Sequence, residues 1–597
     1  MLKKSFPASF NFAHISLAFI GLMWVLPFLY YHHAYPITTF YQEWGTALLG
    51  LCALPLLLTS RYWQAPHVPR IVMLPLGLMG VLLVQFLLGR INHVDHVLLL
   101  SLYFLLTILL MMLGQRLREE LGLPWVATAL AIFLVVGAEL NTLAGLVQHY
   151  QWHTFLSAVV TAKTSASVYG NTAQPNHFAN YIALGLFSLG LLLATQRLRN
   201  WQAALLALPM LFVLVLSGSR SGWLYLTFAL VLAWLWQRKD KALRPLFSYA
   251  LLLWLGYLAM HVVVQIPWLA GATGSVTAAE RFFGGMAGGS IRVDLWREAW
   301  TVFTHFPLLG AGFGEFGYQH FSLSAEVQNL KFMGLYNNAH NIVLQIAAEA
   351  GLAGLGVLLL ASGLFVWQSF VRQVQFNVYH WWGAAVLAVL AIHSLLEYPL
   401  WYAYFIGIAA VMLGVFERTT YTLELRLMGR LSVAALLILG GIFLLQAMQS
   451  YRQLETALIY RGMAAQEASY RARAQAELVA VTRYPLLGSY AEMYIAQTLP
   501  VSEDLLTEKL QLSTRALHYI PSAQLAYRHA LLLAMDNHGG AAQTQMKNAI
   551  WSYPGDFPFL LHELQTLASS DPARFAPLLE FATQNFEEYQ RVAVSRK

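Results

Sequence analysis

His340 stands where a polar run ends and a long apolar stretch begins, in the sequence NNAHNIVLQIAAEAG from Asn337 to Gly351. An imidazole titrates near neutral pH, so a histidine at the edge of a membrane span can take a proton from a hydroxyl group at the boundary of lipid and water. The alternative is a histidine that only caps the helix at the interface. Spacing alone leaves both interpretations open.

Two arginines lie in segments that suit an anion. Arg220 occupies the turn SGSRSG (217–222), in which glycines allow a sharp bend and hydroxyls and a guanidinium can bind phosphate. Arg292 follows Ser290, a predicted cap, at the start of an amphipathic helix whose free N–H groups favour an anion. The alternatives are an ordinary loop with one snorkelling arginine and a plain interfacial helix.

Amide side chains gather in the segment YGNTAQPNHFAN (169–180). Asn171, Gln174 and Asn176 could hold sugar hydroxyls or phosphate oxygens, because an amide both donates and accepts hydrogen bonds. The same residues also suit a capping and turn segment, and spacing alone favours that simpler interpretation.

Glu397 and Tyr398 lie near the predicted outer face and are candidates for a partner to the histidine or a donor to the substrate. Asn341, Gln345 and Glu349 share one stripe of the following helix, four residues apart. A carboxylate inside a membrane usually points into the helix bundle and has a partner. We expect this stripe to be structural first and a proton path second.

The chain has no P-loop sequence and no His and carboxylate pairs at metal-ligand spacing. We therefore expect neither a metal nor a nucleotide cofactor. A transfer enzyme without either needs a substrate that is already activated. A lipid pyrophosphate has that property, because arginines can neutralise its leaving group in place of a metal.

Composition assigns the chain to membrane proteins. It has 597 residues, of which 58% are hydrophobic and 11% charged, against about 25% charged in soluble domains. The net charge of +7 lies in short loops rather than in a basic cluster, which excludes nucleic acid as the expected partner. The single cysteine, Cys52, excludes an internal disulfide. We expect no cleaved signal peptide, because the first apolar stretch reads as a span.

Apolar stretches long enough to cross a bilayer number about thirteen. With the N-terminus in the cytoplasm, the cytoplasmic segments carry sixteen Lys and Arg residues, and the opposite loops outside 269–339 carry three. This asymmetry predicts that the long loop 269–339 and all residues after 448 lie on the outer face. The polar motifs then share that face, which suggests one composite site.

Residues 449–597 differ in kind from the rest, with 13 Lys and Arg and 14 Asp and Glu. Pro485, Pro521 and Pro554 are separated by 36 and 33 residues, and each precedes a helical pattern. This period predicts a soluble helical domain resembling tetratricopeptide repeats, the alternative being an irregular helical domain. We therefore divide the chain into a transmembrane catalytic domain, 1–448, and a soluble domain, 449–597.

Several motifs together resemble one known family. The segments GNTAQPNHFANY, SGSRSGW, IRVDLWREAW to FPLLGAGFGEF, AHNIVLQIAAEAGLAG and HSLLEYPLWYAYF are similar to those of the O-antigen ligase/polymerase superfamily of bacterial membrane proteins. The Gln-Pro-Asn and Glu-Tyr-Pro-Leu segments and the soluble tail resemble, more narrowly, the bacterial O-linked protein glycosylation ligases that modify pilins.

This resemblance implies an all-α polytopic fold of the GT-C-like kind in the inner membrane, with its active face and C-terminal domain in the periplasm. It implies transfer of a whole glycan from undecaprenyl pyrophosphate to Ser or Thr hydroxyls of a pilin or periplasmic protein, without a metal. The family's essential histidine corresponds to His340, its glutamine and tyrosine to Gln174 and Tyr398, and its phosphate-binding arginines to Arg220 and Arg292. Asn171, Asn176, Asn341 and Glu397 are added as expected positioning residues.

Other functions remain open at this stage. The acceptor is lipid A–core in a neighbouring branch, and a polymerase would extend the glycan on its carrier. A transporter or flippase would place charged residues along a path at mid-membrane and show inverted repeats of its spans. We expect inversion at the anomeric carbon, because no side chain is obviously placed as a covalent nucleophile.

Overall fold

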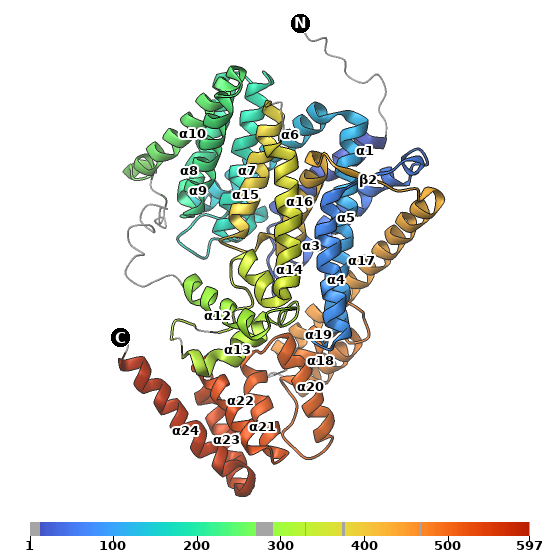
Figure 1. Cartoon of the computed structure of the whole chain (residues 1–597). Helices are drawn as coiled ribbons and strands as arrows, with labels where there is room; N and C mark the ends of the chain where they lie inside the picture. The colour runs from blue at the N-terminus through green and yellow to red at the C-terminus, as the bar shows by residue number, and fades with distance from the viewer. Residues whose placement is uncertain are drawn as a thin grey trace. The chain divides into compact units, whose positions relative to one another are not determined.

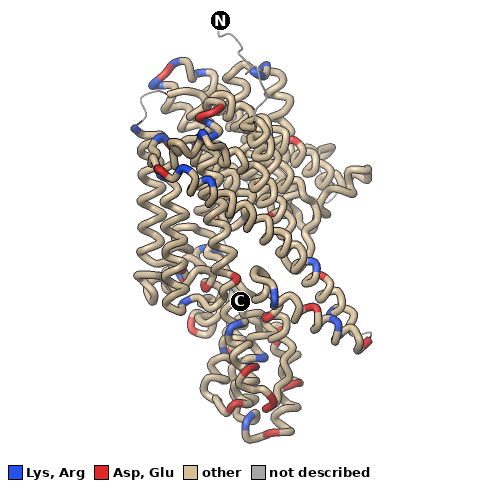
Figure 2. Tube along the Cα trace, turned by 90° about the vertical axis from the view of Figure 1, so that its right-hand side faces the viewer, with Lys and Arg blue, Asp and Glu red and all other residues tan. Residues whose placement is uncertain are grey.

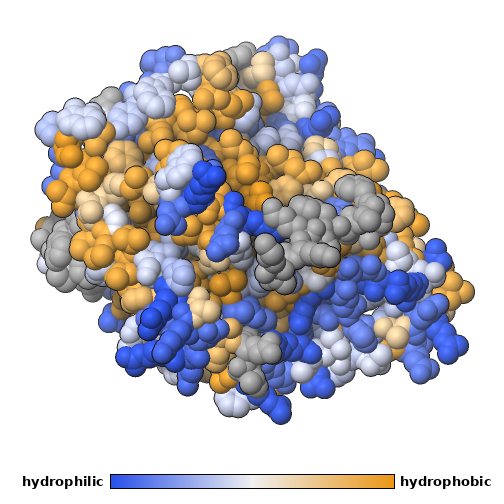
Figure 3. All heavy atoms as spheres, turned by 90° about the horizontal axis from the view of Figure 1, so that it is seen from above, coloured by the Kyte–Doolittle hydropathy of each residue, from blue (hydrophilic) through white to orange (hydrophobic). Residues whose placement is uncertain are grey.

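The computed structural model describes residues 12–269, 271, 291–328, 330–332, 334–372, 376–464 and 467–595. These residues form helices and one small two-stranded sheet (Figure 1). The all-α polytopic class expected from composition is thereby confirmed. Apolar residues cover much of the surface seen in Figure 3. Many large apolar side chains are exposed, among them Leu205, Leu252 and Leu445. Such a surface suits contact with lipid.

Eight helical segments within the described residues are long and apolar enough to cross a membrane. They are Phe12–Leu29, Arg70–Leu87, Val94–Leu121, Leu123–Tyr150, Pro175–Ala194, Lys241–Val263, Ile342–Val371 and Arg426–Met463. Three shorter apolar helices are Asn200–Leu216, Val378–Ser394 and Ala403–Phe416. The chain is a multi-pass membrane protein by this measure, while the count of about thirteen spans stays a prediction.

Packing divides the chain into two compact units. The first comprises 1–76, 102–289 and 357–444, and the second comprises 77–101, 290–356 and 445–597. Composition divides the chain at residue 448, whereas packing groups the C-terminal residues with two earlier segments.

The first unit is built around α7 (Pro175–Ala194), which is buried along almost its whole length. Its neighbours are α6 (Leu123–Tyr150), α8 (Asn200–Leu216), α9 (Ser221–Gln237), α10 (Arg244–Val263) and α15 (Val378–Ser394). A helix that is apolar all round has to be covered on every side. This unit also contains α1 (Phe12–Met23), α2 (Leu26–Leu29), α3 (Phe40–Ala53), most of α5 (Val94–Leu121), α16 (Ala403–Phe416) and helical residues 357–366 and 426–444.

The two strands join loops that the charge pattern assigns to the same side. β1 (His67–Pro69) pairs antiparallel with β2 (Thr420–Thr422), with Val68 opposite Tyr421. Arg118 of α5 donates hydrogen bonds to the carbonyl oxygens of Val415 (3.0 Å) and Glu417 (2.9 Å) beside this sheet. Figure 2 shows few charged residues along the middle of the long helices. The positively charged segments at 61–70, at 116–118 near the end of α5 and at 417–418 therefore meet at one end of the first unit.

In the second unit, α14 (Ile342–Val366) is broken at Gly351, whose φ of 61° and ψ of −158° are not helical. The break frees two backbone N–H groups, and the segment after α12 (Ile291–His305) accepts them. Leu352 N donates to Pro307 O at 2.8 Å, and Ala353 N donates to Leu308 O at 3.1 Å. The unit also contains α13 (Phe316–Val327), most of α4 (Met73–Leu87) and the end of α17 (Arg426–Met463).

The C-terminal residues form a succession of helices, each packed against the next in most cases. They are α18 (Ala468–Val481), α19 (Gly488–Ala496), α20 (Leu506–Tyr519), α21 (Ala523–Met535), α22 (Gly539–Ser552), α23 (Phe557–Ser570) and α24 (Pro572–Ser595). Pro485, Pro521 and Pro554 each lie two or three residues before the second helix of a pair. The repeated unit is thus a helical hairpin, and its kinship with tetratricopeptide repeats stays a prediction.

Candidate active site

The amide segment before α7 forms its N-terminal cap. Gln174 Oε1 accepts a hydrogen bond from the backbone N–H of His177 at 2.5 Å, and Pro175 occupies the first helical position. Asn171 is buried, and its side chain is engaged on both ends. Its Nδ2 donates to Leu29 O (2.9 Å) and Val159 O (2.8 Å), while its Oδ1 accepts from Thr161 N (3.0 Å). Asn171 therefore shapes the loop through backbone contacts.

Asn176 joins two segments that are far apart in the sequence. Its Nδ2 donates to Glu397 Oε1 at 2.7 Å, and its Oδ1 accepts from Ser219 Oγ at 2.8 Å. Glu397 and Ser219 are both buried. One amide thus connects the start of α7 to the turn before α9 and to the loop after α15. Three of the motifs predicted to share the outer face meet at this point of the first unit.

Arg220 directly follows Ser219 and precedes α9. Its side chain is exposed, and among the described residues none forms an ion pair with it. A guanidinium with no carboxylate partner, fixed at a hydrogen-bonded turn, is available to bind an anion. In the loop that follows α15, burial raises the pKa of the Tyr398 phenol and so keeps that group protonated at neutral pH.

Tyr398 lies beside a group of aromatic rings. Its ring stacks on Tyr402 with centroids 5.8 Å apart, and Tyr402 stacks on Tyr404 at 5.3 Å. His177 packs edge-on against Tyr402 at 5.1 Å and against His393 at 5.5 Å. These rings belong to residues that neighbour Asn176 and Glu397 in the sequence, so an aromatic cluster adjoins this hydrogen-bonded pair.

His340 lies in the second unit. The sequence predicted that a helix begins at residue 340, but the helix begins two residues later. The helix begins at Ile342, and Asn341 caps it by accepting hydrogen bonds from Val343 N (3.0 Å) and Leu344 N (3.2 Å). His340 has a left-handed backbone with φ of 53°, and its N–H donates to Asn338 Oδ1 at 2.8 Å. His340 is therefore not the cap, and its half-buried side chain belongs to the turn that leads into α14.

The stripe below Asn341 holds the surrounding loops in place. Gln345 is buried, and its Oε1 accepts from Ala339 N at 2.7 Å. Glu349 is also buried, and its Oε1 accepts from Phe316 N at 3.4 Å. These contacts agree with the structural role expected first for this stripe. Gln345 in particular supports the turn that carries His340.

Sequence reasoning missed the segment that packs on the break in α14. Ala311 N and Gly312 N donate to the carbonyl oxygens of Ala348 (2.9 Å) and Glu349 (3.0 Å). Gly310 has φ of 71°, and a Cβ there would lie 2.2 Å from the carbonyl carbon of Glu349. The sequence GAGFG could have indicated this tight turn, because glycine readily adopts positive φ and all three of its glycines do so here.

Arg292 is the second residue of α12 and is half-buried. The capping residue expected at Ser290 lies outside the described residues. Arg297, one and a half turns further, pairs with Asp294 at 3.4 Å and is largely exposed, so it remains the weaker candidate. Among the described residues, no group of three His, Cys, Asp or Glu side chains is placed to hold a metal.

The predicted site residues thus fall into two sets. The first unit holds Asn171, Gln174, Asn176, Arg220, Glu397 and Tyr398, and hydrogen bonds connect Asn176 with Glu397 and with the residue next to Arg220. The second unit holds Arg292, His340 and Asn341, of which the last two are neighbours in one turn. The composite site expected from the sequence requires residues from both units.

Two protein families match parts of the chain that contain predicted site residues. A family described as "O-Antigen ligase" matches residues 205–359, which include Arg220, Arg292 and His340. Over this segment the chain is similar to that family. A second family, described as "Virulence factor membrane-bound polymerase, C-terminal", matches residues 381–566, which include Glu397 and Tyr398.

Two curated proteins of Acinetobacter baylyi are similar to this chain. A general O-oligosaccharyltransferase is 25% identical over 415 residues, which cover 68% of this chain and 70% of the relative. A ComP-specific O-oligosaccharyltransferase is 24% identical over 243 residues, or 40% of this chain and 41% of the relative. The chain is accordingly an enzyme of the glycosyltransferase type.

Proposed function

We propose that this enzyme transfers a complete oligosaccharide from undecaprenyl pyrophosphate to Ser or Thr hydroxyls of periplasmic or pilin proteins. The observation that carries the proposal is the similarity over 68% of the chain to a protein named as a general O-oligosaccharyltransferase. The exposed Arg220, held at a turn by the Ser219–Asn176 hydrogen bond, supports an anionic donor.

In the mechanism we propose, the acceptor hydroxyl oxygen forms a bond to the anomeric carbon of the glycan. The bond from that carbon to the phosphate oxygen breaks, and undecaprenyl pyrophosphate leaves with the electron pair. Arg220 and Arg292 bind the pyrophosphate and stabilise its charge as it leaves. His340 accepts the proton of the acceptor hydroxyl. This single displacement inverts the anomeric configuration, and no step uses a metal ion.

The other polar residues position these groups. Asn341 and Gln345 hold the turn of His340, and Asn176 with Glu397 holds the turn of Arg220. Tyr398 stays a neutral phenol, since burial raises its pKa, and it can donate a hydrogen bond to a sugar or phosphate oxygen. Gln174 fixes the start of α7 from its capping position.

The proposal also assigns sides to the membrane. We place the enzyme in the bacterial inner membrane, with the N-terminus in the cytoplasm and the site and residues 449–597 in the periplasm. The excess of positive charge in the loops that meet at the β1–β2 sheet supports this orientation.

A polymerase is the second candidate, because the family matched at 381–566 is described by that activity. A ligase for lipid A–core is the third. The decisive experiment mixes purified enzyme with undecaprenyl-pyrophosphate glycan, EDTA and two acceptors, a pilin and lipid A–core. Glycan on Ser or Thr of the pilin supports the proposal, glycan on lipid A–core moves the function to the other ligase branch, and a longer lipid-linked glycan indicates the polymerase.

His340→Ala tests the role of the histidine in the same assay, with His562→Ala as control. His562 is an exposed histidine of α23, so its loss should leave transfer unchanged. We expect His340→Ala to lose transfer at saturating donor and acceptor. A variant that keeps most of its turnover would restrict His340 to binding.

A further inference from the structure

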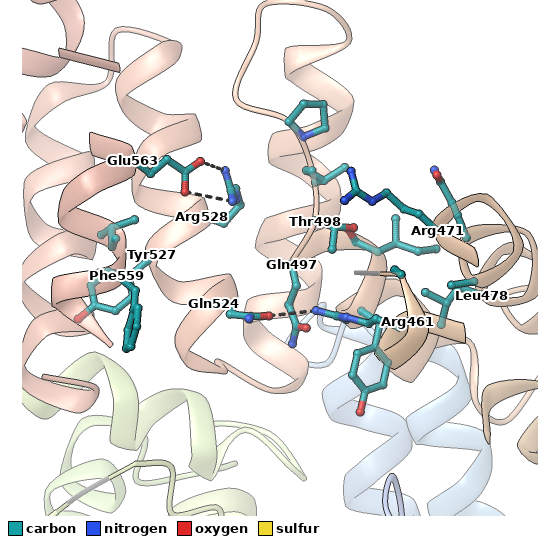
Figure 4. A pocket seen from close by; sticks show the side chains of 18 of the residues that line it. Arg461, Arg471, Leu478, Gln497, Thr498, Gln524, Tyr527, Arg528, Phe559 and Glu563 are labelled. Carbon is teal, nitrogen blue, oxygen red and sulfur yellow. Dashed lines mark hydrogen bonds and ion pairs between the residues drawn. The ribbon is translucent and has the colours of Figure 1, made fainter. Parts of the chain in front are cut away.

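The C-terminal helices enclose a cavity of about 990 Å³ that the proposed chemistry does not use (Figure 4). Its walls come from the end of α17, from α18, from α19 and the segment to Pro500, and from α21 and α23. All of these belong to the second unit. Arrays of helical hairpins generally bind their partners along such concave surfaces, and this volume lies within the range of ligand sites.

Arg461 and Arg471 give one wall of the cavity an uncompensated positive charge. Arg461 Nη2 donates to Gln524 Oε1 at 3.0 Å, and its guanidinium lies 5.5 Å from the centre of the Tyr494 ring. Arg461 Nη1 is buried and makes no hydrogen bond with any described residue. Arg471 is exposed, and no described carboxylate forms an ion pair with it. A buried guanidinium donor without a partner favours an incoming carboxylate.

The opposite wall combines apolar side chains with one ion pair and the carboxylate of Asp556. Arg528 pairs with Glu563 at 2.5 Å, so its charge is already neutralised. Phe559 is 82% exposed, although it lines the cavity, and Tyr527 and Leu560 lie beside it in the lining. In Figure 4, Phe559 and Tyr527 lie across the cavity from Arg471 and Leu478. An exposed phenylalanine and an unpaired guanidinium that face each other across one cavity suit a ligand with both apolar and acidic groups.

We propose that this cavity binds an extended acidic segment of another polypeptide. Asp or Glu side chains of the segment pair with Arg461 and Arg471, and a neighbouring apolar side chain packs on Phe559. An extended chain fits the mixture of lining groups, because successive side chains point to opposite sides. The proposal that an acidic segment binds is argued from the cavity alone. The further statement that the bound polypeptide is the glycan acceptor rests on the proposed function.

The test uses the full-length enzyme in nanodiscs and fluorescence anisotropy. The probe is a labelled ten-residue peptide in which Glu and Asp alternate with Phe and Leu, amidated at its C-terminus. The comparison peptide carries Gln and Asn in place of Glu and Asp. We expect the acidic peptide to bind at least tenfold more tightly than its amide counterpart, and the advantage to shrink at high salt.

Charge reversal identifies the site. Arg471→Glu should weaken binding of the acidic peptide at least tenfold, and Phe559→Ala should weaken both peptides. Arg473→Glu is the matched control, because Arg473 belongs to the same helix, contacts Tyr470 at 5.7 Å and does not line the cavity. Equal affinity for both peptides, or an equal loss with Arg473→Glu, would overturn the proposal.

Two further outcomes separate this proposal from the proposed function. Competition of the peptide by free donor glycan, with the same sensitivity to Arg471→Glu, would make the cavity a sugar site and overturn the assignment to polypeptide. If the acidic peptide binds as expected but the enzyme transfers no glycan to any protein, the binding site stands and the proposed function fails.

Discussion

The hydrogen bonds of Asn176 offer the sharpest test of how the turn bearing Arg220 is held. Asn176→Ala removes one bond to the Glu397 carboxylate and one from the Ser219 hydroxyl, at 2.7 and 2.8 Å. A hydrogen bond to a charged group contributes about 1.5–3 kcal/mol, and a neutral bond contributes about 1 kcal/mol. The two together stabilise this corner of the first unit by about 3 kcal/mol.

Only part of that free energy should affect kcat/KM for glycan transfer. The Ser219 bond directly orders the turn before α9, so about 1–1.5 kcal/mol of ordering is lost for the arginine. Since 1.4 kcal/mol corresponds to a factor of ten, kcat/KM for glycan transfer should fall roughly tenfold. Loss of the Glu397 bond should add to this fall, because it loosens the loop that carries Tyr398.

A double-mutant cycle separates the two contributions. Ser219→Ala alone should reduce kcat/KM about tenfold, and Asn176→Ala with Ser219→Ala should cost less than the sum of the single changes, with a coupling of about 1 kcal/mol. The assay is initial-rate transfer with a varied lipid-linked donor. Asn180→Ala is the control, because this asparagine lies one turn along α7, is fully buried and makes no side-chain hydrogen bond with any described residue.

Additive single changes would refute this reasoning, as would an Asn176→Ala enzyme with unchanged kcat/KM. An Asn180→Ala enzyme that loses as much activity as Asn176→Ala would show that any change in α7 is harmful. The hydrogen-bonded corner would then have no special part in donor binding.

Three other predictions concern packing, pH and topology. Gly310→Ala should destabilise the enzyme by several kcal/mol, because its Cβ would lie 2.2 Å from the backbone of α14. Gly356→Ala is the control, because its Cβ would meet no atom within 4 Å, and it should not lower the midpoint of thermal unfolding. Burial lowers the pKa of His529 from 6.5 to about 4, so the folded state disfavours its charged form and stability is lost as pH falls from about 6.5 toward 4. The loss between pH 7 and 5 should be about 2 kcal/mol, measured by pulse proteolysis in urea, and should shrink in His529→Gln. Arg197 is one of the sixteen Lys and Arg residues that the charge pattern assigns to the cytoplasm, whereas His562 lies in the proposed periplasmic domain. In a cysteine-free background, an impermeant maleimide added to spheroplasts should label His562→Cys but not Arg197→Cys, and the opposite pattern would invert the proposed orientation.

Charge and hydropathy predicted the fold class because they act on long stretches of chain. Membrane spans need about 20 predominantly apolar residues, and α7, with 20 residues, meets this requirement. The break of α14 at Gly351 was not predicted, because the apolar run continues through it. It depends on backbone acceptors supplied by residues 307 and 308, and a contact of that kind leaves no periodic pattern in the sequence.

The candidate site was predicted by residue type more than by residue role. Asn171 and Asn176 are identical in chemistry and lie five positions apart, yet the first is used by backbone groups and the second joins Glu397 to Ser219. The role of each amide depends on the loops that fold over it, and those loops come from distant parts of the chain.

The same argument bears on Arg220. A single arginine in a short loop is chemically ambiguous, because snorkelling and anion binding use the same side chain. The structure adds that the turn is tied to a buried carboxylate through one amide, and a snorkelling arginine has no need of that connection. Order at the turn reduces the entropy lost when an anion binds, so the ties of Asn176 favour a binding role for Arg220 over a purely interfacial one.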